Sequence, residues 1–168
     1  NNFKNIFKFA RLIVLNYSIG YYDKGNYEEI KKERIIIKPK SLVFDEQAIK
    51  FHNITMKKAL KKGMDPVIAM EKFVNDFKYV NYIVSHNVEF HLKALMVELM
   101  RSCVYFDFSK KNIIDIISFN HDLKYPSLKT LSKEILGNDY SDKSNKYNLI
   151  IIRKVFVELY KRYEKELI

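Results

Sequence analysis

The residues of this chain whose types could do chemistry gather at one polar corner, Ser85-His86-Asn87. A histidine can ligate a metal or accept a proton near neutral pH. The apolar stretch 82–84 precedes the corner, and apolar residues then recur at helical spacing: Phe90, Leu92, Leu95, Met96 and Leu99. This pattern predicts a buried strand that runs into a helix, with the corner at the helix N-terminus. Because α/β folds place their chemistry at such corners, we expect the site here.

The elements before the corner are expected to form a hairpin. Loose alternation predicts a first strand at 6–9 and a stronger one across 11–22. Residues 23–26, Asp-Lys-Gly-Asn, are typical of a hairpin turn, because Gly and Asn tolerate positive φ. A third strand is predicted at 33–38 and is stopped by Pro39.

Helices and one more strand complete the expected elements, each marked by a capping residue or by its apolar period. They are, in chain order, a helix opened by Asp65-Pro66, a helix over 88–101, a strand over Asn112–Asp115, a helix from 125–131 to Gly137, and a closing helix over 147–167. Strands and helices in this order predict an α/β protein.

Composition places the chain among ordinary globular proteins. At 168 residues and 20.1 kDa it is expected to be one domain, residues 1–168, with 48% apolar and 30% charged residues. The single cysteine, Cys103, cannot form an internal disulfide, and its neighbours predict a buried thiol at a helix end. No apolar run approaches the roughly 20 residues of a membrane span, and no signal-peptide pattern is visible. We therefore expect an intracellular, cytoplasmic protein without membrane partners.

The charge balance is strongly basic. Thirty Lys and Arg residues oppose 20 Asp and Glu residues, which gives a net charge of +10 and a pI near 9.5. Such a balance favours anionic partners, nucleic acid first, through contacts to phosphates and the release of counterions. A second interpretation stays open, because an abundance of Lys, Asn, Ile and Tyr also reflects AT-rich coding sequences, where lysines accumulate on solvated faces.

Two segments carry a family resemblance. Residues 86–90 read His-Asn-Val-Glu-Phe and are followed by Leu95 and by Glu98-Leu99, which closely resembles the second motif of the DnaQ-like (DEDDh) 3′–5′ exonucleases. Residues 52–55, His-Asn-Ile-Thr, are similar to the family's His-Gly-Ile-Thr segment, which lies near the path of the bound strand. The residues alone also allow a structural role for this segment, with Ile54 packed inward and Thr55 capping the next helix.

The resemblance implies a fold and a chemistry. The fold would be ribonuclease-H-like, α/β, with a five-stranded mixed sheet flanked by helices. The chemistry would use two divalent ions, roughly 3.5–4 Å apart, that activate a water and stabilise the leaving oxygen of a phosphodiester. In the family these ions are held by an Asp-x-Glu on the first strand and by two further Asp residues, and a His acts as the general base.

This sequence departs from each of those positions. His91 stands at the family's second-motif Asp, and the best alignment of the last helix puts Asn145 at the general base and Ile150 at the final Asp. No acidic residue precedes Asp23, so the Asp-x-Glu is missing. Since Mg²⁺ and Mn²⁺ prefer carboxylate oxygens, we expect no metal site and no cofactor. Glu89 and Glu98 are expected to face solvent or to form local salt bridges.

The sequence therefore predicts a degenerate, inactive exonuclease-like domain that acts as a nucleic-acid-binding or protein-interaction module. Its partner would be a single-stranded nucleic acid or a protein of a replication or repair complex. By motif position, the expected nucleic-acid-binding residues are His52, Asn53, His86, Asn87 and Lys93. One alternative is an active exonuclease, dependent on Mg²⁺ or Mn²⁺, whose Asp-x-Glu segment is missing from this sequence. Another is a purely structural subunit, marked by an exposed apolar patch without a basic face.

Overall fold

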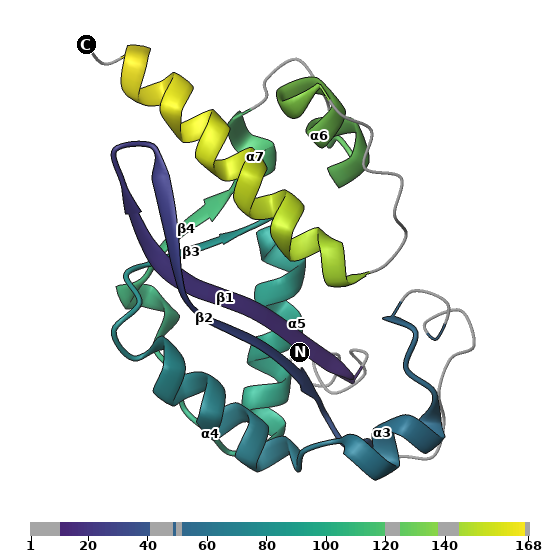
Figure 1. Ribbon diagram of the computed structural model, residues 1–168. Helices are drawn as coiled ribbons and strands as arrows, with labels where there is room; N and C mark the ends of the chain where they lie inside the picture. Colours follow the sequence, from purple (N-terminus) through teal and green to yellow (C-terminus); the bar gives the residue numbers. More distant parts are fainter. Residues whose placement is uncertain (1–10, 41–48, 50–51, 120–124, 138–144, 167–168) are drawn as a thin grey trace. The chain divides into compact units, whose positions relative to one another are not determined.

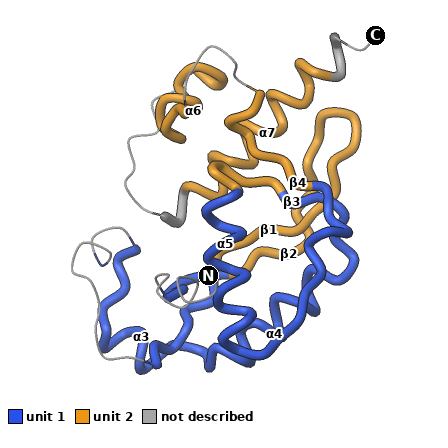
Figure 2. Tube along the Cα trace, turned by 180° about the vertical axis from the view of Figure 1, so that it is seen from behind, with its two compact units in different colours: residues 1–15, 34–83, 89–112 blue, residues 16–33, 84–88, 113–168 orange. Residues whose placement is uncertain are grey.

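The computed structural model describes residues 11–40, 49, 52–119, 125–137 and 145–166 (Figure 1). The chain divides into two compact units, which Figure 2 shows in different colours. Unit 1 comprises residues 1–15, 34–83 and 89–112, and unit 2 comprises residues 16–33, 84–88 and 113–168. Each unit contains buried apolar residues of its own.

The first two strands form an antiparallel hairpin. Strand β1 (Val14–Asp23) and strand β2 (Asn26–Ile36) pair with each other and are joined by a two-residue turn. Lys24 and Gly25 both have positive φ, 44° and 81°, which matches the twist of the flanking strands. The hairpin turn predicted at 23–26 is confirmed, and β2 begins directly after it, earlier than the predicted third strand.

The other two strands form a parallel pair. Strand β3 (Tyr82–Ser85) pairs with strand β4 (Asn112–Asp115), and helix α5 (Val88–Arg101) lies between them in the sequence. A parallel pair needs such a crossover, because a tight turn can only join antiparallel strands. The predicted strand at Asn112–Asp115 and the predicted helix at 88–101 are both confirmed.

The predicted five-stranded mixed sheet is wrong. In the part of the chain that the structure describes, β1 pairs only with β2 and β3 only with β4, so the α/β fold has two sheets of two strands. The strand expected at 6–9 lies outside the described residues. The physical reason for the error is that alternation of apolar and polar residues marks a strand but carries no information on which other strand pairs with it.

Two capped helices belong to unit 1. Helix α3 (Met56–Lys62) begins where Thr55 Oγ1 accepts the Lys58 N–H at 3.2 Å. Helix α4 (Pro66–Phe77) begins where Asp65 Oδ1 accepts the Val67 N–H at 2.8 Å. Both caps agree with the sequence. The buried apolar residues of this unit include Ile35, Ile37, Ile54, Ala59, Ala69, Met70, Phe73, Phe77, Leu95, Val97 and Leu99.

Two details of α5 and its end differ from the prediction. Phe90 and Met96 are 52% and 46% exposed, although the helical period placed them on the buried face, whereas Leu95 and Leu99 are buried as expected. Cys103 is exposed rather than buried. Cys103 follows the end of α5 and has a φ of 54°, which is not a helical conformation. Its side chain therefore does not continue the buried face of the helix, as the prediction assumed.

Unit 2 is built around the last two helices. Helix α6 (Leu128–Leu136) starts at the Ser127 cap and ends at Gly137, whose φ of 69° gives a left-handed stop. Helix α7 (Asn145–Glu166) packs against α6 (Figure 1). Their shared core also includes Ile116 from the 3-10 turn η2 (Ile116–Phe119). Its buried members are Ile116, Leu131, Ile135, Ile151, Val155 and Leu159.

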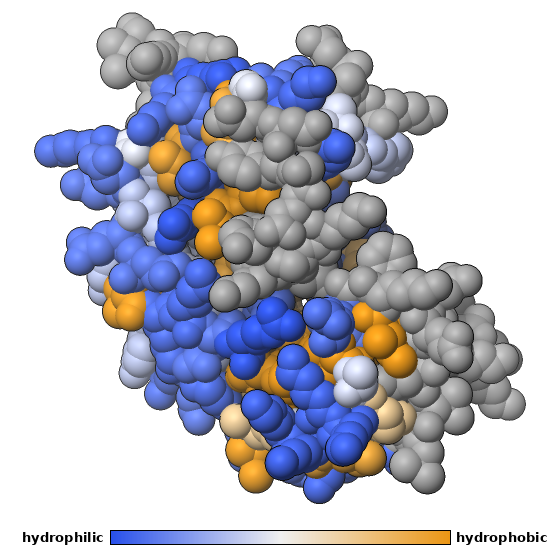
Figure 3. Space-filling model, turned by 45° about the vertical axis from the view of Figure 1, so that its right-hand side comes forward, coloured by the Kyte–Doolittle hydropathy of each residue, from blue (hydrophilic) through white to orange (hydrophobic). Residues whose placement is uncertain are grey.

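On the face shown in Figure 3, hydrophilic residues cover most of the described surface, and apolar residues gather in smaller areas between them. None of the helices in the described part of the chain is both long enough and apolar enough to cross a membrane.

Candidate functional site

The predicted corner lies in unit 2 and is fixed by contacts to two other segments. His86 Nε2 lies 2.8 Å from the Pro126 carbonyl oxygen, so this nitrogen carries a proton and donates it to the carbonyl. Asn87 has a φ of 56°, a left-handed conformation that Asn adopts more readily than most residues. Both residues therefore have structural tasks at the corner, and only the Asn87 side chain is exposed.

Asp115 closes the corner from the end of β4. Its Oδ1 accepts the N–H of Asn87 at 3.0 Å, and its Oδ2 accepts the N–H of Val88 at 2.8 Å. Oδ1 also accepts the Ile117 N–H at 3.1 Å. Free N–H groups at a helix N-terminus attract phosphates, but here the N–H groups of Asn87 and Val88 already donate to the Asp115 carboxylate. The corner is thus a capped helix start, a role for Asp115 that the sequence interpretation missed.

The predicted site residues of α5 lie in unit 1. Lys93 is exposed and forms an ion pair with Glu89, and this hydrogen-bonded ammonium lowers the pKa of the Glu89 carboxyl. His91 is exposed, with its ring 5.6 Å from the ring of Phe90 in an edge-on arrangement. Within the described residues, no three His, Cys, Asp or Glu side chains gather as metal ligands would.

The remaining degenerate positions lie on α7 in unit 2. Asn145 is the first residue of α7, and its side chain lies outside the described part of the structure. Ile150 is half-buried on the same helix. An isoleucine has no atom that could bind a metal, so at this position the side chain contributes packing only.

The segment 52–55 lies in unit 1 and has the structural role that the sequence analysis offered as an alternative, with Ile54 packed inward and Thr55 capping α3. Ile54 is fully buried, and its N–H donates to His52 Nδ1 at 3.0 Å. Burial, and secondly the nearby charge of Arg34, lowers the pKa of His52, so the imidazole is neutral near pH 7. Asn53 is exposed with a φ of 52° and lies three residues before the first residue of α3.

A basic surface surrounds α3, and we call it the basic α3 surface. It consists of Lys38, Lys57, Lys58, Lys61 and Lys62, all exposed. The last four belong to the seven-residue helix itself, which contains no acidic residue. Among the described residues, none of the five lysines has an ion-pair partner. The two consecutive lysine pairs in 56–62 are visible in the sequence, but the sequence alone does not indicate that Lys38 lies beside them.

Main-chain contacts place Lys38 beside the end of α3. The Lys38 N–H donates to the Met64 carbonyl at 2.8 Å, and Ile37 and Met64 form a parallel bridge. At Gly63 the backbones approach so closely that a Cβ there would lie 2.7 Å from the Lys38 Cα. A side chain at 63 would force these segments apart, so glycine lets Lys38 lie beside the residues that follow α3.

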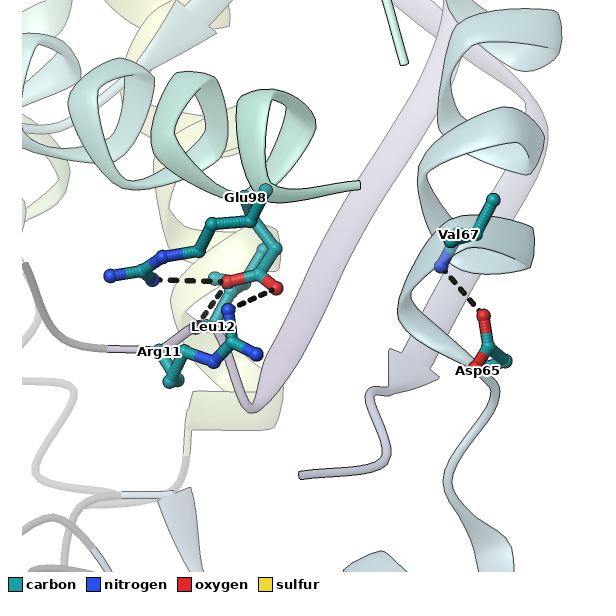
Figure 4. Close-up of polar contacts among 6 residues, drawn as sticks. Arg11, Leu12, Asp65, Val67 and Glu98 are labelled. Carbon is teal, nitrogen blue, oxygen red and sulfur yellow. Dashed lines mark hydrogen bonds and ion pairs between the residues drawn. The ribbon is translucent and has the colours of Figure 1, made fainter. Parts of the chain in front are cut away.

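A buried charge cluster elsewhere in unit 1 has a structural purpose (Figure 4). Glu98 is only 1% exposed, contrary to the expected solvent-facing position, although its pairing with Arg101 at 3.4 Å is the expected local salt bridge. It also pairs with Arg11 at 3.4 Å and accepts the Leu12 N–H at 3.4 Å. Glu98 thus fixes the chain just before β1 to helix α5.

A groove in unit 2 is also formed by charged residues. It has a volume of about 400 Å³ and lies between the β1–β2 turn and α7. Arg153 in this groove pairs with Glu29 at 3.1 Å and lies over the Tyr27 ring at 5.4 Å. Burial raises the pKa of the Tyr27 hydroxyl, which lies 2.9 Å from Ser18 Oγ. These contacts hold the hairpin on α7.

Comparisons with known proteins add no family to this description. No protein-family model matches the chain, and no curated protein matches it.

Proposed function

We propose that this chain is a non-catalytic domain that binds nucleic acid through the basic α3 surface. The observation that carries the proposal is that Lys57, Lys58, Lys61 and Lys62 are all exposed on one short helix without an acidic neighbour in it. Lys38 adds a fifth positive charge beside the helix end. A polyanion is the ligand for which such a surface is suited.

The physical basis is electrostatic. Each lysine that neutralises a phosphate releases condensed counterions, and this gain in entropy drives binding without regard to base sequence. These lysines suit this purpose because no ion pair with another described residue has to be broken before they contact a phosphate. The net charge of +10 adds a long-range attraction of the same sign.

The non-catalytic part of the proposal depends on the sequence alone. The positions that resemble the carboxylates and the base of DnaQ-like exonucleases hold His91, Asn145 and Ile150. An imidazole and an aliphatic side chain carry no negative charge, so they cannot replace the two carboxylates that balance the charge of two Mg²⁺ ions, and an amide cannot act as the base. Descent from that family is a separate proposal, and binding through the basic α3 surface does not depend on it.

A salt series tests this function. The binding of a fluorescently labelled single-stranded 20-mer is measured by anisotropy between 50 and 200 mM salt. If about five phosphates are neutralised, the logarithm of the association constant should fall with log salt with a slope of about −3.5. Absence of binding at the lowest salt, or a slope near zero, would contradict the proposal. Digestion of the strand after Mn²⁺ is added would overturn the non-catalytic part.

A further inference from the structure

Two tyrosines of unit 1 are almost fully exposed. Tyr79 follows α4 and is 83% exposed, and Tyr105 follows α5 and is 81% exposed. Single exposed apolar residues are common on protein surfaces and mean little by themselves. These two are different, because the backbone that carries each of them is held in place by a common cluster of contacts.

The centre of this cluster is Lys111. Its ammonium donates to the carbonyl oxygens of Phe77, Lys78 and Val80 at 3.1, 3.2 and 2.6 Å. These carbonyls belong to the end of α4 and to the turn after it, where a cation is favoured by the helix dipole. The turn that carries Tyr79 is therefore fixed on both sides of the tyrosine.

The segment that carries Tyr105 contacts the same lysine. The ring of Phe106 lies 5.5 Å from Lys111 Nζ and 5.3 Å from the ring of Phe73, which is buried on α4. Phe106 is thus anchored to the core, and the neighbouring Tyr105 side chain remains in solvent. Lys111 joins the two segments, so both tyrosines extend from one anchored part of the unit.

The charges around the tyrosines favour an anionic ligand. Lys78 Nζ lies 5.3 Å from the centre of the Tyr79 ring. Lys110 is also exposed and pairs with Asp107 Oδ2 at 3.5 Å, whereas the N–H and the hydroxyl of Ser109 donate to Asp107 Oδ1. These hydrogen bonds lower the pKa of the Asp107 carboxyl. The side chains of Lys78 and Lys110 are both exposed, so their ammonium groups are accessible to an anion.

We infer that Tyr79 and Tyr105 stack on the bases of an unpaired nucleic-acid strand. This inference rests on the proposed function and adds a second contact region, at the end of α4 opposite α3. Stacking on an aromatic ring needs a base whose face is accessible, which a single strand offers and a duplex does not. The backbone that carries each ring is already held in place, so less conformational entropy is lost when a base binds.

The test separates base stacking from phosphate binding by the choice of probe. The parent protein is titrated with a thymidine 20-mer, with an abasic strand of the same length, and with a duplex. We expect the thymidine strand to bind at least tenfold more tightly than the abasic strand, because stacking contributes roughly a factor of ten per base. The double variant Tyr79→Ala/Tyr105→Ala should lose that difference and keep the affinity for the abasic strand.

Controls keep the result interpretable. Both tyrosines are exposed, so the variants should retain the circular dichroism and Tm of the parent. Tyr79→Phe/Tyr105→Phe should bind as the parent does, since the rings remain. Tyr21→Ala removes another exposed tyrosine, in unit 2, and should change nothing. Equal affinity of the parent for the thymidine and abasic strands would overturn the inference alone, whereas no binding of either strand would overturn the proposed function with it.

Discussion

Glu98 shows how one residue can differ from what its sequence context indicates. A glutamate on a helix is normally solvated, and the sequence predicted that Glu98 would face solvent or form a local salt bridge. In the structure the carboxylate is buried and is surrounded by Arg11, Arg101 and the Leu12 N–H. Two of these three donors come from a distant part of the chain, so local sequence could not reveal them.

Removing the charge of Glu98 should therefore destabilise the protein. Glu98→Gln removes the negative charge that pairs with two guanidinium groups, one of which belongs to a nearly buried side chain. Breaking a buried pair on one side commonly costs about 3 kcal/mol, and we expect a loss of that size in the free energy of unfolding by urea. Glu89→Gln is the control on the same helix and should leave stability nearly unchanged, because Glu89 is exposed. An equally small effect at both positions would contradict the structural role of Glu98.

The lowered pKa of His52 predicts how the stability of the protein changes with pH. Its pKa is lowered in the folded protein, first by burial and then by Arg34, so the unfolded chain binds the proton more readily. The stability that the neutral imidazole contributes is complete above the unfolded pKa of about 6.5 and is lost as the pH falls through the folded pKa. Between pH 7 and pH 5 the parent should lose more stability than His52→Gln. A His52 pKa above 6.5 in an NMR titration would contradict this assignment.

At the scale of elements, helix starts and stops were the most predictable features. Thr55, Asp65, Ser127 and Gly137 act within their own turns. The caps at Thr55 and Asp65 and the stop at Gly137 were predicted from residue type and position, and Ser127 lies within the helix start predicted at 125–131. Asp115 is the exception because its partners at the start of α5 lie more than twenty residues earlier. A cap supplied across space leaves no local signal, and for this reason it was missed.

The cap from Asp115 can be tested by hydrogen exchange. Asp115→Ala removes the acceptor of three backbone N–H groups, so the amides of Asn87, Val88 and Ile117 should exchange much faster. The free energy of unfolding should fall by about 1–2 kcal/mol, as for the loss of other helix caps. Asp65→Ala is the matched control, because it should expose the Val67 amide and leave the Val88 amide protected. Unchanged exchange at Val88 in Asp115→Ala would show that the cap is not formed.

At the scale of the whole molecule, the α/β class was predictable and the sheet was not. Every strand of the described chain was anticipated at least in part, since alternation and turn residues are local. Which strands pair is decided by contacts between distant segments, and the expected sheet followed the family resemblance instead. The same limit applies to the candidate site. The corner at 85–87 could be located from its local sequence motif. The basic α3 surface could not, because it includes Lys38, which contacts Gly63 and Met64 only in the folded chain.

The central claim, that the basic α3 surface binds nucleic acid, is tested most directly by a comparison of two variants with equal net charge. One variant changes Lys57, Lys58, Lys61 and Lys62 of unit 1 to Gln, and the other changes four exposed lysines of unit 2 to Gln: Lys24, Lys32, Lys129 and Lys133. The measurement is the salt slope and the affinity for the labelled single-stranded 20-mer. If the α3 lysines contact phosphates, their variant should lose most of the affinity and about 2.8 units of slope, at about 0.7 per lysine. The unit 2 variant should lose little of either, and an equal loss in both variants would show that net charge alone, and not this surface, attracts the strand.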